Sequence, residues 1–207
     1  MTNFRLPIVA LAISATAYGV LTEHEGWMGT AAIPTKNDRC TNGFGSTFKE
    51  NGEPVKCGET ITPPQAVKRS LAHIAKDETR LKQCVTAPVS QKEYDLLVNH
   101  AYQYGVDVTC KSFMVKNVNA GNYAKACEGY TLYKMSGGFD CSTPGNKICS
   151  QVWTRSLNRK ADCLAAQNDT EILVVTPLLS EPEPAPAPEP LVRPKTWFAR
   201  FKDWVGL

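Results

Sequence analysis

Apolar residues recur at helical spacing through the middle of the chain. Thr62 is a good N-cap, and the two prolines after it suit a first turn, so the pattern predicts a helix over 63–83. A second helix is predicted over 91–104, with Ser90 as its cap and Gly105 at its end. Shorter helical patterns follow at 111–118, 122–129 and 150–162. The middle of the chain is therefore predicted to be helical.

Between Gly26 and about Gly58 the helical pattern is absent, and the segment is rich in Gly, Thr, Pro and Asn. Gly43 and Gly45 alternate with an apolar residue, and the pair Asn51-Gly52 is typical of a tight turn. This segment predicts a small antiparallel hairpin. A hairpin lobe before a helical lobe places the chain in the α+β class.

An uncharged segment from Leu6 to Leu21 predicts an apolar N-terminal helix. Its sixteen residues would span about 24 Å, short of a hydrocarbon core of roughly 30 Å. Alanines and a glycine dilute its apolar residues, so we expect it to enter a membrane without staying there. Ala15-Thr16-Ala17 has the form of a signal-peptidase site, which leaves open a cleaved signal with a mature start near Tyr18. A permanent anchor also stays open.

The composition changes again from residue 167. An alternating proline run over 180–190 predicts an extended linker, which we place at 167–194. The last residues, 195–207, combine aromatic residues on one helical face with Lys and Arg, which favours a basic amphipathic helix at a membrane or wall surface. A helix that folds back onto the catalytic domain is the alternative. The predicted domains are an apolar segment at 1–22, a catalytic domain at 23–166, the proline-rich linker at 167–194 and the basic amphipathic helix at 195–207.

Charge and length narrow the function classes. The net charge of +3 in 207 residues suits an anionic wall or lipid surface. The chain lacks the clusters of basic residues that nucleic-acid-binding proteins have, so we predict no nucleic-acid partner. One catalytic domain is expected from this length. We also predict that the protein is a monomer.

Eight cysteines, an even number, all follow the apolar segment, which favours disulfides in an oxidising compartment. The chain has no Cys-x-x-Cys pair and its three histidines are scattered, so we predict no metal and no cofactor. Eight cysteines allow 105 pairings, and sequence does not select among them. Our working hypothesis pairs Cys110 with Cys127, Cys84 with Cys163, Cys141 with Cys149, and Cys40 with Cys57.

Two motifs suggest chemistry. Glu25-Gly26-Trp27 follows the apolar segment, and Thr41-Asn42-Gly43-Phe44-Gly45-Ser46-Thr47 begins sixteen positions after Glu25. Together they resemble the active-site core of the phage-type lysozymes, glycoside hydrolase family 24. The resemblance implies a lysozyme-like fold and an endolysin that hydrolyses the β-1,4 bond between N-acetylmuramic acid and N-acetylglucosamine in peptidoglycan, for host-cell lysis. A lytic transglycosylase and a non-enzymatic, membrane-active, disulfide-rich antibacterial protein are the alternatives.

The position of the acid beside the apolar segment is similar to that in endolysins of the signal-arrest-release type. In these the enzyme is inactive while the segment is in the membrane and becomes active once the segment leaves it. The resemblance implies a protein first at the host inner membrane and then in the periplasm, with the membrane as a partner through residues 1–22 and the tail.

Glycoside cleavage needs an acid for the leaving oxygen and a second group on the opposite face of the sugar. Glu25 is the candidate acid, and it needs partial burial to stay protonated near neutral pH. Thr41 matches the family threonine that helps to hold the attacking water. The position of the family aspartate falls on Pro34 and Thr35, so either Asp38, the only acid between Glu25 and Thr41, or Thr35 takes the second role.

Three downstream stretches extend the likeness. Asn99 to Val106 is similar to the family's Phe-Asn-x-Gly helix end, and Lys116 to Tyr123 to its Leu-Asn-x-Gly-x-Tyr stretch. Trp153 to Arg159 resembles its C-terminal helix, although the usual glycine and second arginine are missing. By that match Arg159, supported by Asn158, would approach Glu25 and orient it. A solvated basic face is the alternative.

Overall fold

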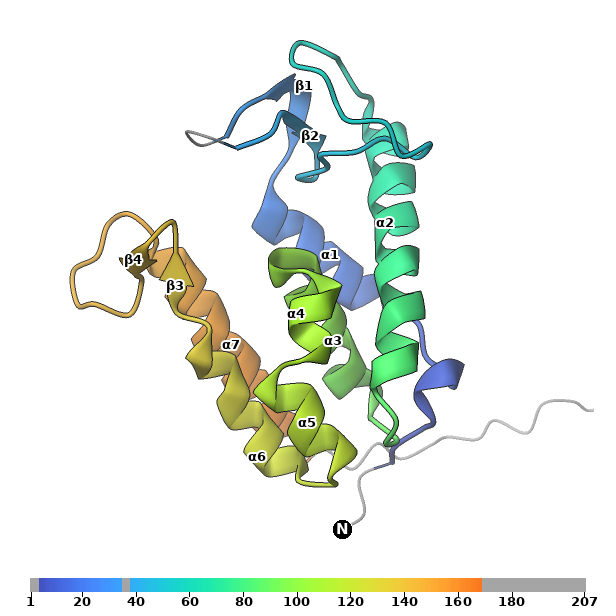
Figure 1. Ribbon diagram of the computed structural model, residues 1–207, viewed down its shortest axis with the longest axis vertical. Coiled ribbons are helices and arrows are strands. Elements are labelled where there is room, and N and C mark those ends of the chain that lie inside the picture. Colours follow the sequence, from blue (N-terminus) through green and yellow to red (C-terminus); the bar gives the residue numbers. More distant parts are fainter. Residues whose placement is uncertain (1–3, 35–37, 169–207) are drawn as a thin grey trace, which may run out of the picture. The chain divides into compact units, whose positions relative to one another are not determined.

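The computed structural model describes residues 4–34 and 38–168. Thr35, nearly all of the predicted linker and the predicted tail helix lie outside the described residues. Helices make up most of the described chain, and two small antiparallel sheets lie among them (Figure 1). In chain order the elements are η1 Ile8–Ala10, α1 Ala15–Glu25, β1 Met28–Ala32, β2 Thr41–Gly43, α2 Pro63–Cys84, α3 Gln91–Tyr104, α4 Val106–Cys110, α5 Phe113–Asn119, α6 Tyr123–Glu128, η2 Gly129–Leu132, β3 Met135–Ser136, β4 Phe139–Asp140 and α7 Ser150–Ala166.

The predicted α+β class, a hairpin lobe before a helical lobe, is confirmed. In the hairpin lobe β1 pairs antiparallel with β2, with Met28 opposite Gly43, Ala32 opposite Thr41 and an irregularity between these pairs. Gly43 packs tightly on α2: a Cβ built there would lie 2.8 Å from the Cβ of Ala66. The chain therefore presses the hairpin against the start of α2, as the ribbon shows (Figure 1).

Capping residues fix the starts of α2 and α3, and a glycine ends α3. Thr62 and Gln65 form a capping box at the start of α2, and Ser90 and Glu93 form one at the start of α3. Gly105, with a φ of +90°, ends α3 where the sequence predicts. The buried face of α3 forms much of the helical core, with Tyr94, Leu96, Leu97, Val98, His100 and Ala101.

The prediction of one helix over Leu6 to Leu21 is wrong. A short 3-10 turn, η1, is followed by an extended stretch, and α1 begins only at Ala15. The hydroxyl of Ser14 accepts the amide of Ala17 and so caps α1 at that point. Within the described residues, no helix is both long and apolar enough to cross a bilayer.

Contacts with the rest of the domain explain the break. The amide of Leu6 donates to the carbonyl of Val89 and the amide of Val89 to the carbonyl of Leu6, both at 2.9 Å. Ile8 and Leu11 are buried in the same core as Leu21. Burying these side chains is worth about 1.5 to 3 kcal/mol each, which outweighs the stability of an isolated short helix. The segment is part of the folded domain.

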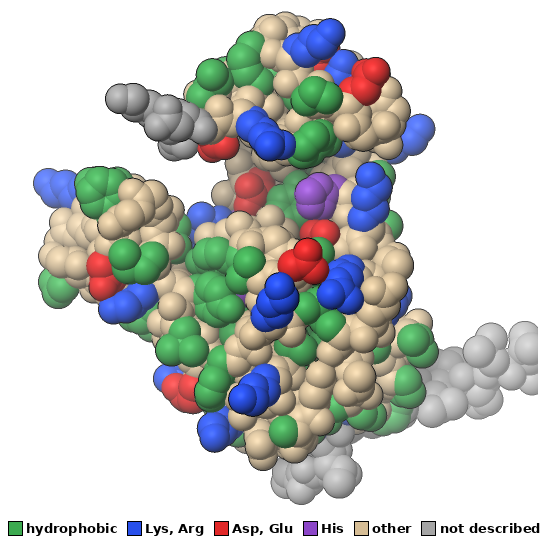
Figure 2. Space-filling view, in the orientation of Figure 1, with side chains coloured by type: hydrophobic (Ala, Val, Ile, Leu, Met, Phe, Trp, Pro, Cys, Tyr) green, Lys and Arg blue, Asp and Glu red, His purple; other side chains and the backbone are tan. Residues whose placement is uncertain are grey.

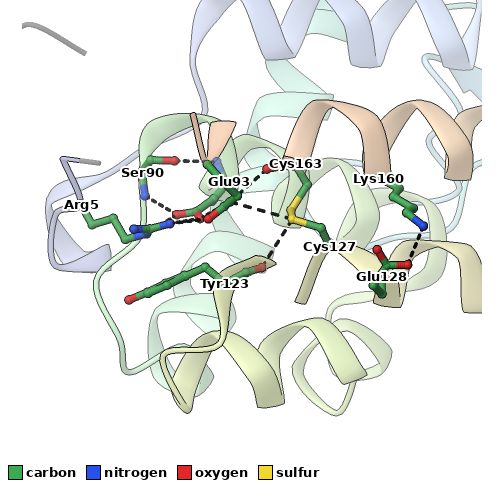
Figure 3. The surroundings of a disulfide bond; sticks show 9 residues. Arg5, Ser90, Glu93, Tyr123, Cys127, Glu128, Lys160 and Cys163 are labelled. Atoms are coloured by element: carbon green, nitrogen blue, oxygen red, sulfur yellow. Dashed lines mark hydrogen bonds and ion pairs between the residues drawn. A yellow bond between two sulfur atoms is a disulfide. The ribbon is translucent and has the colours of Figure 1, made fainter. Parts of the chain in front are cut away.

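Two of the four hypothesised disulfides are confirmed and two are wrong. Cys40 pairs with Cys57, and Cys141 with Cys149. The other pairs are Cys84 with Cys110 and Cys127 with Cys163, with Cα atoms 5.6 and 5.4 Å apart. The reason is helix packing, because α2 packs on α4 and α6 packs on α7, which brings these cysteines together. Figure 3 shows the second pair beside the N-terminal segment.

Candidate active site

Glu25 is the last residue of α1, which ends at Gly26 with a φ of +70°. Two contacts hold this helix in place: Leu21 is buried in the core, and the hydroxyls of Tyr18 and Ser70 in α2 are hydrogen-bonded at 2.7 Å. The C-terminal end of α1 is thereby held next to the hairpin lobe. The acid sits where two lobes meet.

The carboxyl of Glu25 is 24% exposed. Burial raises its pKa above the usual value, and the nearby positive charges of Arg155 and then Arg159 oppose that rise without cancelling it. A carboxylic acid needs partial burial of this kind to donate a proton near neutral pH.

The turn after β2 closes over this carboxyl. Gly45 has a φ of +75°, and a Cβ built on it would lie 2.9 Å from Oε2 of Glu25. The hydroxyl of Tyr102 donates to the carbonyl of Phe44 at 2.6 Å and ties the turn to α3. Burial, and next the charge of Glu25, raise the pKa of Tyr102, so this hydroxyl keeps its proton.

A cavity of about 460 Å³ opens in front of Glu25. The three predicted catalytic residues all line it: Glu25 from α1, Asp38 from the loop before β2, and Thr41 from β2. Its other lining residues are His24, Met28, Pro34, Gly43, Gly45, Thr47, His73, Tyr102, Gln103 and Arg155. Figure 2 shows the hollow below the hairpin lobe, with acidic and histidine side chains on its floor. Residues that are far apart in the sequence therefore converge on one site.

Asp38 and Thr41 are held differently. One carboxylate oxygen of Asp38 accepts the amide of Arg39 at 2.8 Å, the local bond typical of a loop aspartate. Thr41 is buried, in the strand that pairs with β1. Both remain candidates for positioning water.

The resemblance implies that Arg159 approaches and orients Glu25, but the ion pair with Glu25 is formed by Arg155. Nη1 of Arg155 lies 3.9 Å from Oε1 of Glu25. Arg159, 5% exposed, donates instead to Asn99 at 2.8 Å and to Gln103 at 2.5 Å. The reason is helix geometry, since Arg155 lies one turn nearer to the start of α7. Arg159 acts on Glu25 only through its charge.

Asn158 does not line the cavity of Glu25. It lines a second cavity of about 260 Å³ between α1, α3 and α7, together with Arg159. His24 lines both cavities, and its pKa is lowered by partial burial and then by Arg155 and Arg159. This histidine is therefore neutral near pH 7.

Sequence reasoning missed the roles of Arg155, Tyr102, Gln103 and His73. The first three lie in stretches that resemble the lysozyme family, but no spacing distinguishes them from their neighbours. Within residues 4–34 and 38–168, no group of three His, Cys, Asp or Glu side chains is placed to hold a metal ion.

Comparisons with known proteins find similar sequences and folds. The family model described as phage lysozyme matches residues 22–146, more than half of the chain. The chain is 28% identical over 97 residues to the endolysin of Salmonella phage P22, and 27% identical over 128 residues to that of Bacillus phage B103. These matches cover 47% and 61% of this chain, but only 66% and 47% of the relatives, less than two thirds of either.

The fold has solved counterparts. The endolysin from Escherichia coli O157:H7 phage FAHEc1 superposes with a TM-score of 0.64, over 78% of this chain and 96% of that one. Its sequence is 24% identical to this chain, so the likeness concerns the fold. It extends over most of the described domain.

Proposed function

Because the chain belongs to the phage lysozyme family, we propose that it is an endolysin that hydrolyses the β-1,4 bond between N-acetylmuramic acid and N-acetylglucosamine in bacterial peptidoglycan. The observation that carries the proposal is the setting of Glu25. Its carboxyl has a raised pKa and faces a cavity that Asp38 and Thr41 also line. An acid and two water-positioning groups around one cleft suit glycoside hydrolysis.

In the proposed reaction Glu25 protonates the glycosidic oxygen as the bond breaks. Arg155 then stabilises the carboxylate that remains, because its guanidinium is close without forming a short ion pair. The hydroxyl of Thr41 and the carboxylate of Asp38 hold the water that attacks the opposite face of the sugar. Gly45 leaves the acid room to reach its substrate.

Purified peptidoglycan tests the proposal. Wild-type protein should release new reducing ends, and Glu25→Gln should lower the rate by about 10²- to 10⁴-fold, the usual contribution of a general acid. Glu23→Gln is the matched control, because it makes the same change two residues away at an exposed position of α1. Asp38→Asn and Thr41→Ala measure the water-positioning roles. Full activity in Glu25→Gln would reject the proposed chemistry.

The products separate hydrolysis from lytic transglycosylation. A hydrolase leaves a reducing muramic acid end, whereas a transglycosylase leaves an anhydro sugar that is lighter by one water. Mass spectrometry of the fragments distinguishes the two. The alternative of a non-enzymatic antibacterial protein predicts no cleaved fragments at all.

We further propose that the protein is exported by its N-terminal segment and is activated in the periplasm when that segment leaves the membrane. While residues 6–21 are in lipid, the backbone pairing of Leu6 with Val89 and the bond from Tyr18 to Ser70 cannot form. The same segment continues into the helix that ends at Glu25, so its release completes the active site.

This proposal differs from a cleaved signal in a measurable way. Cleavage before Tyr18 would remove Ile8, Leu11 and the cap Ser14. The contacts of these residues in the folded domain support a mature protein that keeps its N-terminal segment. Mass spectrometry of the protein from the periplasm should find the N-terminal segment intact. A mature start near Tyr18 would overturn this part of the proposal.

A further inference from the structure

A second, basic cavity adjoins the candidate active site. It has a volume of about 320 Å³, and its lining residues are Phe48, Lys49, Glu50, Gly52, Arg69, Ala72, His73 and Lys76. His73 also lines the cavity of Glu25, so the two hollows share a wall. A substrate bound at Glu25 therefore lies next to the basic cavity.

Positive charge dominates this cavity. Lys49, Arg69 and Lys76 line it, and among the residues that the structure describes Glu50 is its only acidic lining residue. Figure 2 shows basic side chains on the hairpin lobe and on the helical lobe beside the hollow. The local charge balance favours a ligand that carries negative charge.

The basic residues have distinct partners. Arg69 is held in place, because it donates to Asn42 at 2.8 Å and to Glu50 at 3.3 Å. Lys49 is paired with Glu59 at 2.8 Å. In the part of the chain that the structure describes, Lys76 forms no salt bridge, and its side chain is exposed on α2. Lys76 is the cation best placed to meet a ligand.

An aromatic ring completes the cavity. Phe48 is 42% exposed, and the guanidinium of Arg39 lies 5.3 Å from its centroid. The turn at Gly52 borders it with no large side chain. An exposed ring beside cations suits a ligand with small apolar groups next to carboxylates.

We propose that this basic cavity binds the acidic stem peptide of the peptidoglycan strand that is being cleaved, with Lys76 contacting a stem carboxylate. The inference rests on the proposed function. The stem is attached to the muramic acid sugar, so a strand in the cleft of Glu25 brings a peptide to the adjoining cavity. Stem peptides combine carboxylates with alanine methyl groups, the chemistry that this lining would recognise.

The test compares two substrates: peptidoglycan with intact stems, and glycan strands from which an amidase has removed them. Lys76→Glu should raise KM on intact peptidoglycan by about three- to tenfold, in the range expected when one exposed ion pair becomes a repulsion, with kcat nearly unchanged. On stem-free glycan, variant and wild type should have equal KM values. Higher salt should weaken wild-type binding to intact peptidoglycan more than variant binding.

Lys125→Glu is the matched control, since Lys125 is an exposed helical lysine on α6, outside this cavity. It should behave as wild type on both substrates. An equal rise of KM for Lys76→Glu on both substrates, or no rise on either, overturns the inference. Loss of the proposed function is recognisable separately, because the wild type would then cleave neither substrate.

Discussion

Oε2 of Glu25 lies only 2.9 Å from the point where a side chain at position 45 would begin, so any side chain there would push the candidate acid out of its place. Real Cβ atoms essentially never come this close to another heavy atom. The glycine also has a φ of +75°, which other residues rarely adopt. The Gly-spaced motif therefore has a structural purpose, which is to let the turn lie directly on the carboxyl.

Gly45→Ala should lower the rate of peptidoglycan cleavage by about 10²-fold, because the added methyl group pushes the Glu25 carboxyl away from the position in which it protonates the substrate. The measurement is the release of reducing ends. Gly145→Ala is the control: Gly145 also has a positive φ, +77°, but nothing lies within 4 Å of its added methyl group. Equal losses in the two variants would show that backbone strain, rather than contact with Glu25, causes the effect.

Arg155 should set the alkaline limit of activity. A general acid works only while protonated, so the rate falls as pH rises through the pKa of Glu25. Burial raises this pKa, and the charge of Arg155 holds it down. Arg155→Gln removes that opposition, so the pKa rises further and the alkaline limb of the pH–rate profile moves to higher pH.

The same profile ranks the two arginines. Arg159→Gln should move the limb in the same direction by less, because Arg155 is the stronger of the two charges acting on Glu25. Arg80→Gln, at an exposed pair with Asp107, serves as the control and should leave the limb in place. A limb that moves to lower pH in Arg155→Gln would contradict the assignment of Glu25 as the acid.

Local sequence signals account for the elements that were predicted well. The helix over 91–104 is found at its predicted bounds because Ser90 and Glu93 specify its start and Gly105 its end. The hairpin was predictable for the same reason, since Gly43 and Gly45 need backbone angles that few residues adopt. In both cases the information lies within a few residues of the element.

Long-range packing decided what the sequence did not predict. The N-terminal segment is not one helix, because Ile8 and Leu11 find partners in a core made by later residues. Arg155 and Arg159 lie on the same face of α7, and only the position of α7 relative to α1 decides which of them reaches Glu25. The wrong disulfides have the same origin, because pairing follows which helices are neighbours.

Arg5 should stabilise the domain through Glu93. Both carboxylate oxygens of Glu93, which is 4% exposed, accept from Arg5, at 2.9 and 2.7 Å (Figure 3). Arg5→Gln leaves a buried carboxylate without its cation, so it should cost about 3 kcal/mol of unfolding free energy at pH 7. Lys92→Gln, at the exposed pair with Asp162, should cost less than about 1 kcal/mol.

The pH dependence follows from the direction of the Glu93 shift. Burial alone would raise the pKa of Glu93, but hydrogen bonds from Arg5, the Ser90 amide and Gln167 outweigh it, so the pKa is lowered. A carboxyl whose pKa is lower in the folded state stabilises the fold above its unfolded value and loses that contribution as pH falls through the folded value. The difference between wild type and Arg5→Gln in urea denaturation should therefore shrink in acid. An unchanged difference would rule out Glu93 as the partner.

The disulfides Cys127–Cys163 and Cys141–Cys149 should differ in how much they stabilise the protein. Cys127–Cys163 closes a loop of 36 residues and Cys141–Cys149 one of 8. In the chain-entropy account, removal of the first bond with a double Ser variant should cost about 4 kcal/mol, and removal of the second about 2.5 kcal/mol.

The first bond also joins α6 to α7, the helix that carries Arg155, so its loss should lower the temperature at which cleavage activity disappears. Thermal denaturation and residual activity after heating measure both effects. If the variant without Cys141–Cys149 proves the less stable of the two, then local packing in the β3–β4 hairpin outweighs loop length, and the entropic argument fails for this protein.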